Sequence, residues 1–184
     1  MQPDAHAVLA RKDDILAHLA RVRERPLDAL RIRPHANLHL GEVLQTDDGW
    51  QIIDFEGETA RPLFERRIKS CALIDVTSMI RSFAYASAAS LGAEDGGEAL
   101  APYARAWTNA MSARFLQTYL QQTRDADFLP TDARERTLLL DAFLIQRMLY
   151  EIDYERNHRP DWLHIPLRGL AAYLKASTEH TRTG

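Results

Sequence analysis

Apolar residues recur at helical spacing through most of this 184-residue chain. Over residues 5–24 they return every three or four positions among charged residues, which predicts an amphipathic helix closed by Pro26. In the second half of the chain the same period is carried by longer stretches with apolar residues on more than one side, as in buried helices. The pattern predicts these further helices over 72–90, roughly 99–123, 131–157 and 166–176.

The two-residue period of a β-strand occurs only in short segments near the start. Residues 30–33, "LRIR", predict a short strand. The segments "EVLQ" and "WQIID" flank "TDDG", whose Asp-Gly pair is a turn signal, so a β-hairpin is expected here. An irregular stretch over 57–71 and a flexible linker, "GAEDGGEA", complete the pattern. The chain is therefore predicted to be mainly α-helical with one small β-hairpin.

Composition narrows the class of protein. Hydrophobic residues make up 46% and charged residues 27%, which is typical of a globular domain with a substantial core. The net charge of −3 and the lack of a basic stripe argue against nucleic acid as a partner. The longest apolar runs are too short to span a bilayer, so no membrane segment is expected. The single cysteine, Cys71, excludes an internal disulfide and fits a reducing cytoplasm, where we expect the protein to lie.

Residues 34–58, "PHANLHLGEVLQTDDGWQIIDFEGE", carry the candidate chemistry. Protein kinases place an orienting aspartate and a metal-binding asparagine on one loop, H-R-D-x-x-x-x-N, and a second metal ligand opens D-F-G after a short hairpin. Here His35 is followed by Asn37, then by Glu42 five positions later, and Asp54 opens D-F-E after the predicted hairpin. Four elements in the kinase order indicate a phosphotransferase loop in which Asn37 stands at the position of the base.

The chain resembles the bacterial maltokinases, which are relatives of the aminoglycoside phosphotransferases and are also found fused to trehalose synthase. The matching segments are "HANLHLGE", "DFEGET", "RPLFERR", "IDVTSMIRSFAYA" and "LLLDAFLIQRMLYEIDYERNHRPDWLHIPLRG". The resemblance covers roughly residues 8–174. It implies the C-terminal lobe of a kinase-like, aminoglycoside phosphotransferase-like fold, so residues 1–184 are expected to form a single domain. Its parts would be an N-terminal helix and lead-in (1–33), a degenerate catalytic loop with the hairpin and metal segment (34–58), and a helical subdomain (72–176).

The resemblance also implies roles for the loop residues. His35 and Asn37 take the catalytic positions, and an amide at Asn37 cannot accept a proton at neutral pH. Glu42 and Asp54 take the positions that hold Mg²⁺ against the phosphates of ATP, and carboxylates suit Mg²⁺. Asp75 matches an acid that hydrogen-bonds the backbone of the catalytic loop, so its expected role is structural. His35 and His39 are four residues apart, but in a loop this spacing favours support of the loop over metal binding.

The late segment "YEIDYERNHRPDW" suggests a sugar site. Tyr150 and Tyr154, and likewise Glu151 and Glu155, are four residues apart, so each pair lies on one helix face. Carboxylates accept hydrogen bonds from sugar hydroxyls, and aromatic rings cover apolar sugar faces. The candidate substrate-binding residues are Tyr150, Glu151, Tyr154, Glu155, Arg159 and Trp162. The alternative is that the glutamates pair with Arg147 or Arg159 and only stabilise the helix.

Two functions follow from the resemblance. In the first, the chain is a catalytically impaired maltokinase-like lobe that acts as a sugar-binding or protein-interaction module in trehalose, maltose or α-glucan metabolism. A sugar such as maltose is then the expected ligand, and a partner protein or a second copy would cover the surface left by the absent nucleotide-binding lobe. In the second, the chain is the C-terminal part of an active ATP-dependent maltokinase, which makes maltose 1-phosphate, and its nucleotide-binding lobe lies on another segment.

Overall fold

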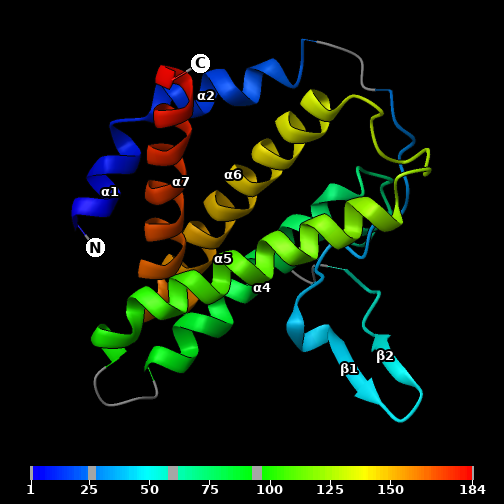
Figure 1. The fold of residues 1–184 in the computed structure, drawn as a ribbon, viewed down its shortest axis with the longest axis horizontal. Helices are drawn as coiled ribbons and strands as arrows, with labels where there is room; N and C mark the ends of the chain where they lie inside the picture. Colours follow the sequence, from blue (N-terminus) through cyan, green and yellow to red (C-terminus); the bar gives the residue numbers. More distant parts are fainter. Residues whose placement is uncertain (1, 25–27, 58–61, 93–96, 184) are drawn as a thin grey trace. The chain divides into compact units, whose positions relative to one another are not determined.

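The computed structural model describes residues 2–24, 28–57, 62–92 and 97–183 (Figure 1). The chain divides into two compact units. Unit 1 consists of Met1–Pro26 and Asp141–Gly184, and unit 2 consists of Leu27–Leu140. In the described part of the chain, the regular structure is helical apart from one two-stranded sheet and an isolated bridge, which confirms a mainly α-helical fold with a small hairpin. Among those helices, none is both long and apolar enough to cross a membrane.

Unit 1 is built from helices that share one apolar core. Its elements are α1 (Gln2–Leu9), α2 (Lys12–Arg21), the later part of α6 (Ala133–His158), the short 3-10 helix η2 (Pro160–Trp162) and α7 (His164–Thr183). Helix α1 packs along α7, as Figure 1 shows in blue and red. The core residues come from all four α-helices and are Val8, Ile15, Ile145, Met148, Leu170 and Leu174.

The single helix predicted over 5–24 is wrong, because the chain breaks between Leu9 and Lys12. Arg11 leaves the helical conformation at φ −108° and ψ 17°. Its guanidinium contacts Asp14 and donates to the backbone carbonyl of Leu174 in α7, at 3.4 Å. No glycine or proline marks the break, so a tertiary contact overrides the local helical pattern.

Unit 2 contains the long helices α4 (Leu73–Gly92) and α5 (Gly97–Gln122), which pack against each other. Phe83 of α4 is buried, and its ring meets the rings of Trp107 and Phe115 of α5 edge-on. The hairpin consists of β1 (Val43–Thr46) and β2 (Gly49–Ile52) and follows a single 3-10 turn, η1 (Leu40–Glu42). The amide of Leu40 donates to Oγ of Ser82 at 2.8 Å, which ties this turn to α4.

The remaining predictions agree with the structure closely for the helices and less closely for the segments between them. The helices predicted over 72–90, 99–123 and 131–157 are confirmed within two residues, and α7 extends beyond the predicted 166–176 at both ends. No strand forms over 30–33, where only Ile32 makes an isolated antiparallel bridge, to Ser70. The stretch expected to be irregular contains a short helix, α3 (Leu63–Arg66). Of the predicted linker, residues 93–96 lie outside the described residues.

Candidate functional site

The backbone of the loop at residues 35–36 is held by one side chain. Asp75, in the first turn of α4, accepts the backbone N–H of His35 through Oδ2 at 2.7 Å and that of Ala36 through Oδ1 at 2.8 Å. Both carboxylate oxygens are therefore used within the fold. Burial raises the pKa of Asp75, while the two backbone N–H groups and the charge of His35 act to lower it. Asp75 thus fixes where the next residue, Asn37, is presented.

His35 is a buried support of the same loop, with 6% of its surface exposed. Its Nε2 lies 2.7 Å from the carbonyl oxygen of Ile53, which only accepts, so Nε2 carries a proton and donates it to this hydrogen bond. The ring also packs on Phe55, with centroids 4.9 Å apart. His35 therefore connects the loop to the segment after β2. This arrangement uses the ring for anchoring, with Nδ1 buried and without a hydrogen-bond partner among the described residues.

Two non-glycine residues of the site have left-handed backbone. Ala36 has φ +67° and Asp54 has φ +57°. Few residues other than glycine adopt this region, because the Cβ crowds the backbone there. Ala36 is forced into it by the two hydrogen bonds to Asp75, and Asp54 lies where the chain turns out of β2. Strain of this kind persists only when surrounding contacts fix the backbone, and it is concentrated at functional sites.

The two predicted metal ligands lie at the base of the hairpin, one on each strand. Val43 pairs with Ile52, and the amide of Ile53 donates to the carbonyl oxygen of Glu42 at 3.0 Å, so Glu42 lies opposite Ile53 and Asp54 is the next residue along. The Glu42 carboxylate is mostly covered and lies 3.2 Å from Nε2 of His39. His39 Nδ1 accepts the N–H of Gly41 at 3.1 Å, which leaves Nε2 to carry a proton toward Glu42.

The predicted metal ligands Glu42 and Asp54 both carry carboxylates, which suit Mg²⁺, and Asp54 is exposed. Within the described ranges there is no group of three or more His, Cys, Asp or Glu side chains that could hold a metal ion. A cation held by this pair would therefore complete its coordination with phosphate oxygens and water, as Mg²⁺ commonly does.

Asn37 is half-buried and follows the two residues that Asp75 holds. Its side chain offers an amide oxygen and an NH₂ group at the position where a kinase loop carries its carboxylate. The amide can orient a hydroxyl by hydrogen bonds, but it cannot take up the hydroxyl proton. The loop thus keeps its supports while its central residue lacks the chemistry of a general base.

The candidate sugar residues lie in unit 1, along the last turns of α6 and into η2. Tyr150 and Tyr154 stack with centroids 6.2 Å apart, and His158 stacks on Tyr154 at 4.4 Å. The guanidinium of Arg159 lies 5.4 Å from the ring centre of Tyr154 and 5.2 Å from that of Trp162. The four-residue spacing of these side chains therefore produces a continuous row of aromatic and cationic groups, which we call the aromatic row.

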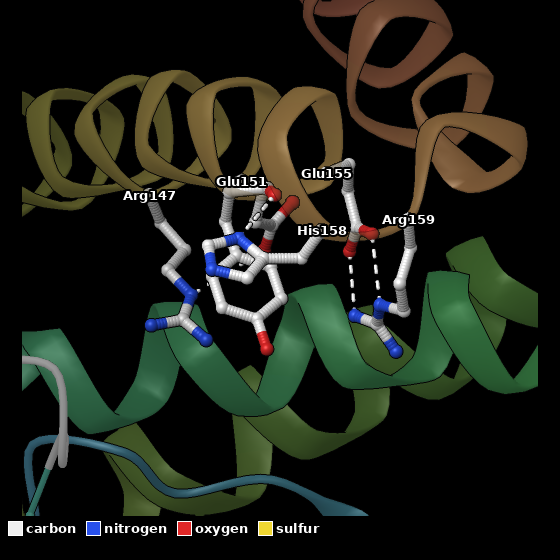
Figure 2. A network of polar contacts seen from close by, with 6 residues as sticks. Arg147, Glu151, Glu155, His158 and Arg159 are labelled. Carbon is white, nitrogen blue, oxygen red and sulfur yellow. Dashed lines mark hydrogen bonds and ion pairs between the residues drawn. The ribbon is translucent and has the colours of Figure 1, made fainter.

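Both glutamates of this segment are buried against arginines, as Figure 2 shows. Glu155 is 1% exposed and receives two hydrogen bonds from Arg159, at 2.9 and 2.6 Å. Glu151 is also buried, and its Oε1 lies 3.4 Å from Nε of Arg147. The pairing of glutamates with arginines, which the sequence left open as the alternative, is thus present. Each carboxylate holds a guanidinium against the aromatic row.

Sequence reasoning missed His158, whose ring extends the row by one turn and whose Nδ1 lies 2.9 Å from the carbonyl oxygen of Tyr154. The signal was present, because His158 follows Tyr154 by four residues, as Tyr154 follows Tyr150. For His39 the sequence favoured support of the loop over metal binding, and the structure places its Nε2 3.2 Å from Glu42, a partner that the sequence did not specify. The residues of the loop site belong to unit 2 and those of the aromatic row to unit 1.

Comparisons with known proteins point to sugar kinases. No protein-family model matches the chain. It is 30% identical over 154 residues to a glucosamine kinase of Streptacidiphilus jiangxiensis, covering 80% of this chain and 34% of that protein. It is also 30% identical over 146 residues to a glucosamine kinase of Mycolicibacterium smegmatis (strain ATCC 700084 / mc(2)155), covering 78% and 35%. The chain thus spans about a third of the length of these curated relatives.

Solved structures show the same likeness. A glucosamine kinase in complex with glucosamine, ADP and inorganic phosphate superposes with a TM-score of 0.67 at 24% identity, over 80% of this chain and 36% of that one. A crystal form of glucosamine kinase, form B, gives 0.64 at 25% identity, over 77% and 33%. The fold is therefore that of part of a sugar kinase. The narrower likeness to maltokinases and to aminoglycoside phosphotransferases stays a prediction.

Proposed function

We propose that this chain is a sugar-kinase-like lobe that binds a sugar and is impaired in phosphoryl transfer. The observation that carries the proposal is Asn37. The backbone before it is held by Asp75 and His35 as a working loop would require, yet the residue itself cannot act as a base. General-base catalysis contributes typically about 10²–10⁴-fold in rate, so its loss alone would reduce turnover strongly.

The sugar is proposed to lie on the aromatic row of α6 and η2. Trp162 offers a ring for the apolar face of a hexose, and Arg159, which lies over the rings of Trp162 and Tyr154, is a donor for hydroxyl groups. Glu151 and Glu155 are buried against arginines, so their role here is to position the cations. The ligand is a hexose or a glucose disaccharide: maltose follows from the sequence resemblance, and glucosamine from the names of the relatives.

The proposal extends to a degenerate nucleotide site. Glu42 and Asp54 would hold Mg²⁺, which would neutralise phosphate charge if ATP were bound. The contact between Nε2 of His39 and Glu42 competes with such a role, because it occupies one carboxylate oxygen. Among the solved structures that resemble this chain, one contains ADP and inorganic phosphate, which supports ATP as the nucleotide of a complete kinase.

One observation favours a second function. The chain spans about a third of the relatives' length. The second proposed function is therefore that of one part of an active kinase, with the nucleotide-binding lobe on another segment. In that case a group other than Asn37 must serve as the base. Glu42 is the nearest carboxylate along the loop, and it is engaged with His39.

The test is a steady-state assay of ADP release from ATP-Mg²⁺ with glucosamine or maltose. We expect the wild-type chain to give no sugar-dependent release, and an Asn37→Gln variant to match it. Sugar-dependent turnover in the range of about 1–100 s⁻¹ that is typical of kinases would overturn the proposal of impaired transfer. If Asn37→Asp gained turnover, the rest of the site would be shown to be intact and only the base lost.

A further inference from the structure

A cluster of cations lies where residues 31–33 meet residues 69–71. Ile32 and Ser70 exchange both backbone hydrogen bonds, at 3.0 and 2.8 Å, in an antiparallel bridge. The adjacent residues therefore stand opposite each other, Arg33 beside Lys69 and Arg31 beside Cys71, on the other side of the backbone from Ile32. Like charges directly opposite each other destabilise a strand pair, so the facing positions of Arg33 and Lys69 suggest that these charges serve a purpose other than stability.

The cations of this surface are not compensated within the described residues. Arg31, Arg67 and Lys69 are exposed, and none of the described carboxylates forms an ion pair with them. Arg33 is exposed too, and its Nη2 donates to the carbonyl oxygen of Phe55 at 3.2 Å, a contact that leaves its charge unpaired. Over residues 62–70 the only carboxylate in the sequence is that of Glu65. The net charge of the whole chain is −3, so this local excess of positive charge runs against the average.

Large apolar side chains are exposed in the same two chain segments. Leu63 and Phe64 of α3 are 59% and 69% exposed, and Ile68 just after it is 56% exposed. Leu30, two residues before the bridge, is also exposed. Contiguous apolar groups with polar neighbours mark interaction sites on proteins. We call this the basic surface, and its residues are Leu30, Arg31, Arg33, Leu63, Phe64, Arg67, Ile68 and Lys69.

We infer that the basic surface docks an acidic, partly apolar segment of another protein. Charge complementarity selects the occupant: carboxylates would offset Arg31, Arg33, Arg67 and Lys69, while leucine-like side chains would cover Phe64 and Ile68. Nucleic acid and anionic membranes are alternative polyanions, and binding of either in place of the acidic segment is an outcome of the test below. This inference is independent of the proposed sugar site, which lies in unit 1.

The probe is a fluorescein-labelled peptide of Glu and Leu at helical spacing, titrated with the full chain and followed by fluorescence anisotropy. We expect saturable binding that weakens as KCl is raised, since screening reduces contacts between exposed charges. The double variant Arg31→Ala, Lys69→Ala should raise Kd at least about tenfold, because two charge-assisted contacts are lost. A peptide with Gln in place of Glu should bind more weakly than the acidic peptide by a similar factor.

A matched control is Arg105→Ala, which removes an exposed cation of α5 and should leave Kd unchanged. Thermal unfolding of each variant checks that the fold is retained. Lys69→Arg keeps the positive charge, so it should bind the peptide more tightly than Lys69→Ala does. The inference is overturned if the acidic peptide fails to bind, or if its Kd is the same for the double variant and Arg105→Ala. It is equally overturned if a short duplex DNA or a phosphatidylserine-containing vesicle binds at this surface and the acidic peptide does not.

Discussion

Ala36 occupies a backbone conformation that its side chain disfavours, at φ +67°. Two hydrogen bonds from the loop to Asp75 hold the chain there. Glycine adopts this region without crowding, so Ala36→Gly should raise the free energy of unfolding by roughly 1 kcal/mol. Urea unfolding followed by circular dichroism measures the change.

The control for this substitution is Ala110→Gly, at an exposed position inside α5. There the same change should lower the free energy of unfolding by about 1 kcal/mol, because glycine is a poor helix former. If both variants were destabilised alike, the loop around Ala36 would not be under the strain that its φ angle indicates.

Asp75 makes the stability of the loop depend on pH. Burial raises its pKa above the ordinary value of 3.8, so the folded state holds this proton more tightly than the unfolded state. Its contribution to stability is then full below the unfolded pKa and is lost as pH rises through the folded pKa. The stability advantage of the wild type over Asp75→Asn should therefore be largest below about pH 4 and shrink as the pH rises above it.

Thermal unfolding of both proteins across this pH range is the measurement. Asp75→Asn also leaves one of the two backbone N–H groups without an acceptor, which costs roughly 1–3 kcal/mol at every pH. This cost adds a constant to the stability difference between the two proteins and does not change how that difference varies with pH. A stability difference that grew with pH would mean that the backbone hydrogen bonds outweigh burial and lower the pKa of Asp75.

Among single residues, the positions of Asp75 and Asn37 could be predicted from the sequence, whereas several side-chain contacts could not. Asp75 and Asn37 follow from motif positions, because the kinase order of the loop is carried by spacing along the chain. The left-handed conformation of Ala36 and the pairing of His39 with Glu42 depend on contacts with α4 and η1, and no local pattern specifies them. Arg11 is similar, since its contact with Leu174 joins residues far apart in the sequence.

Helix α6 shows how an element converts spacing into a site. Arg147, Glu151, Glu155 and Arg159 follow one another in four-residue steps along the end of α6 (Figure 2), and Tyr150, Tyr154 and His158 do the same. The aromatic row and the buried glutamates both follow from this period. The four-residue spacing matches Glu151 to Arg147 and Glu155 to Arg159, and what the sequence left open was whether the glutamates pair with these arginines or face a sugar.

The Glu155–Arg159 pair should matter more than an exposed pair. Glu155 is buried and receives two hydrogen bonds, whereas about half of the Arg159 side chain is exposed and is screened by water. A double-mutant cycle with Glu155→Gln and Arg159→Met should give a coupling energy of about 1–2 kcal/mol. Urea unfolding of the four proteins measures it.

The comparison pair is Arg124–Asp125, whose side chains are 78% and 86% exposed. The same cycle with Arg124→Met and Asp125→Asn should give about 0–0.5 kcal/mol. Equal coupling energies at the two sites would show that burial of Glu155 does not strengthen its pair, and its role in positioning Arg159 would then lose its physical basis.

At the scale of the whole molecule, the helical content and the hairpin could be predicted because they rest on hydrophobic period and turn residues. The division into two units could not, because it depends on which helices share a core: α1 and α2, from the start of the chain, pack with α6 and α7 from its end. The likeness to sugar kinases covers about 80% of this chain and about a third of each relative.

The most direct measurement of the central proposal is isothermal titration calorimetry of glucosamine and of maltose into the full chain, with and without ATP-Mg²⁺. We predict saturable binding of at least one sugar, which is weakened at least about tenfold by Trp162→Ala and left unchanged by Trp50→Ala on the exposed hairpin. We also predict no ADP in the titrated samples when ATP is present. Absence of binding by either sugar, or release of ADP in step with sugar added, would contradict the account.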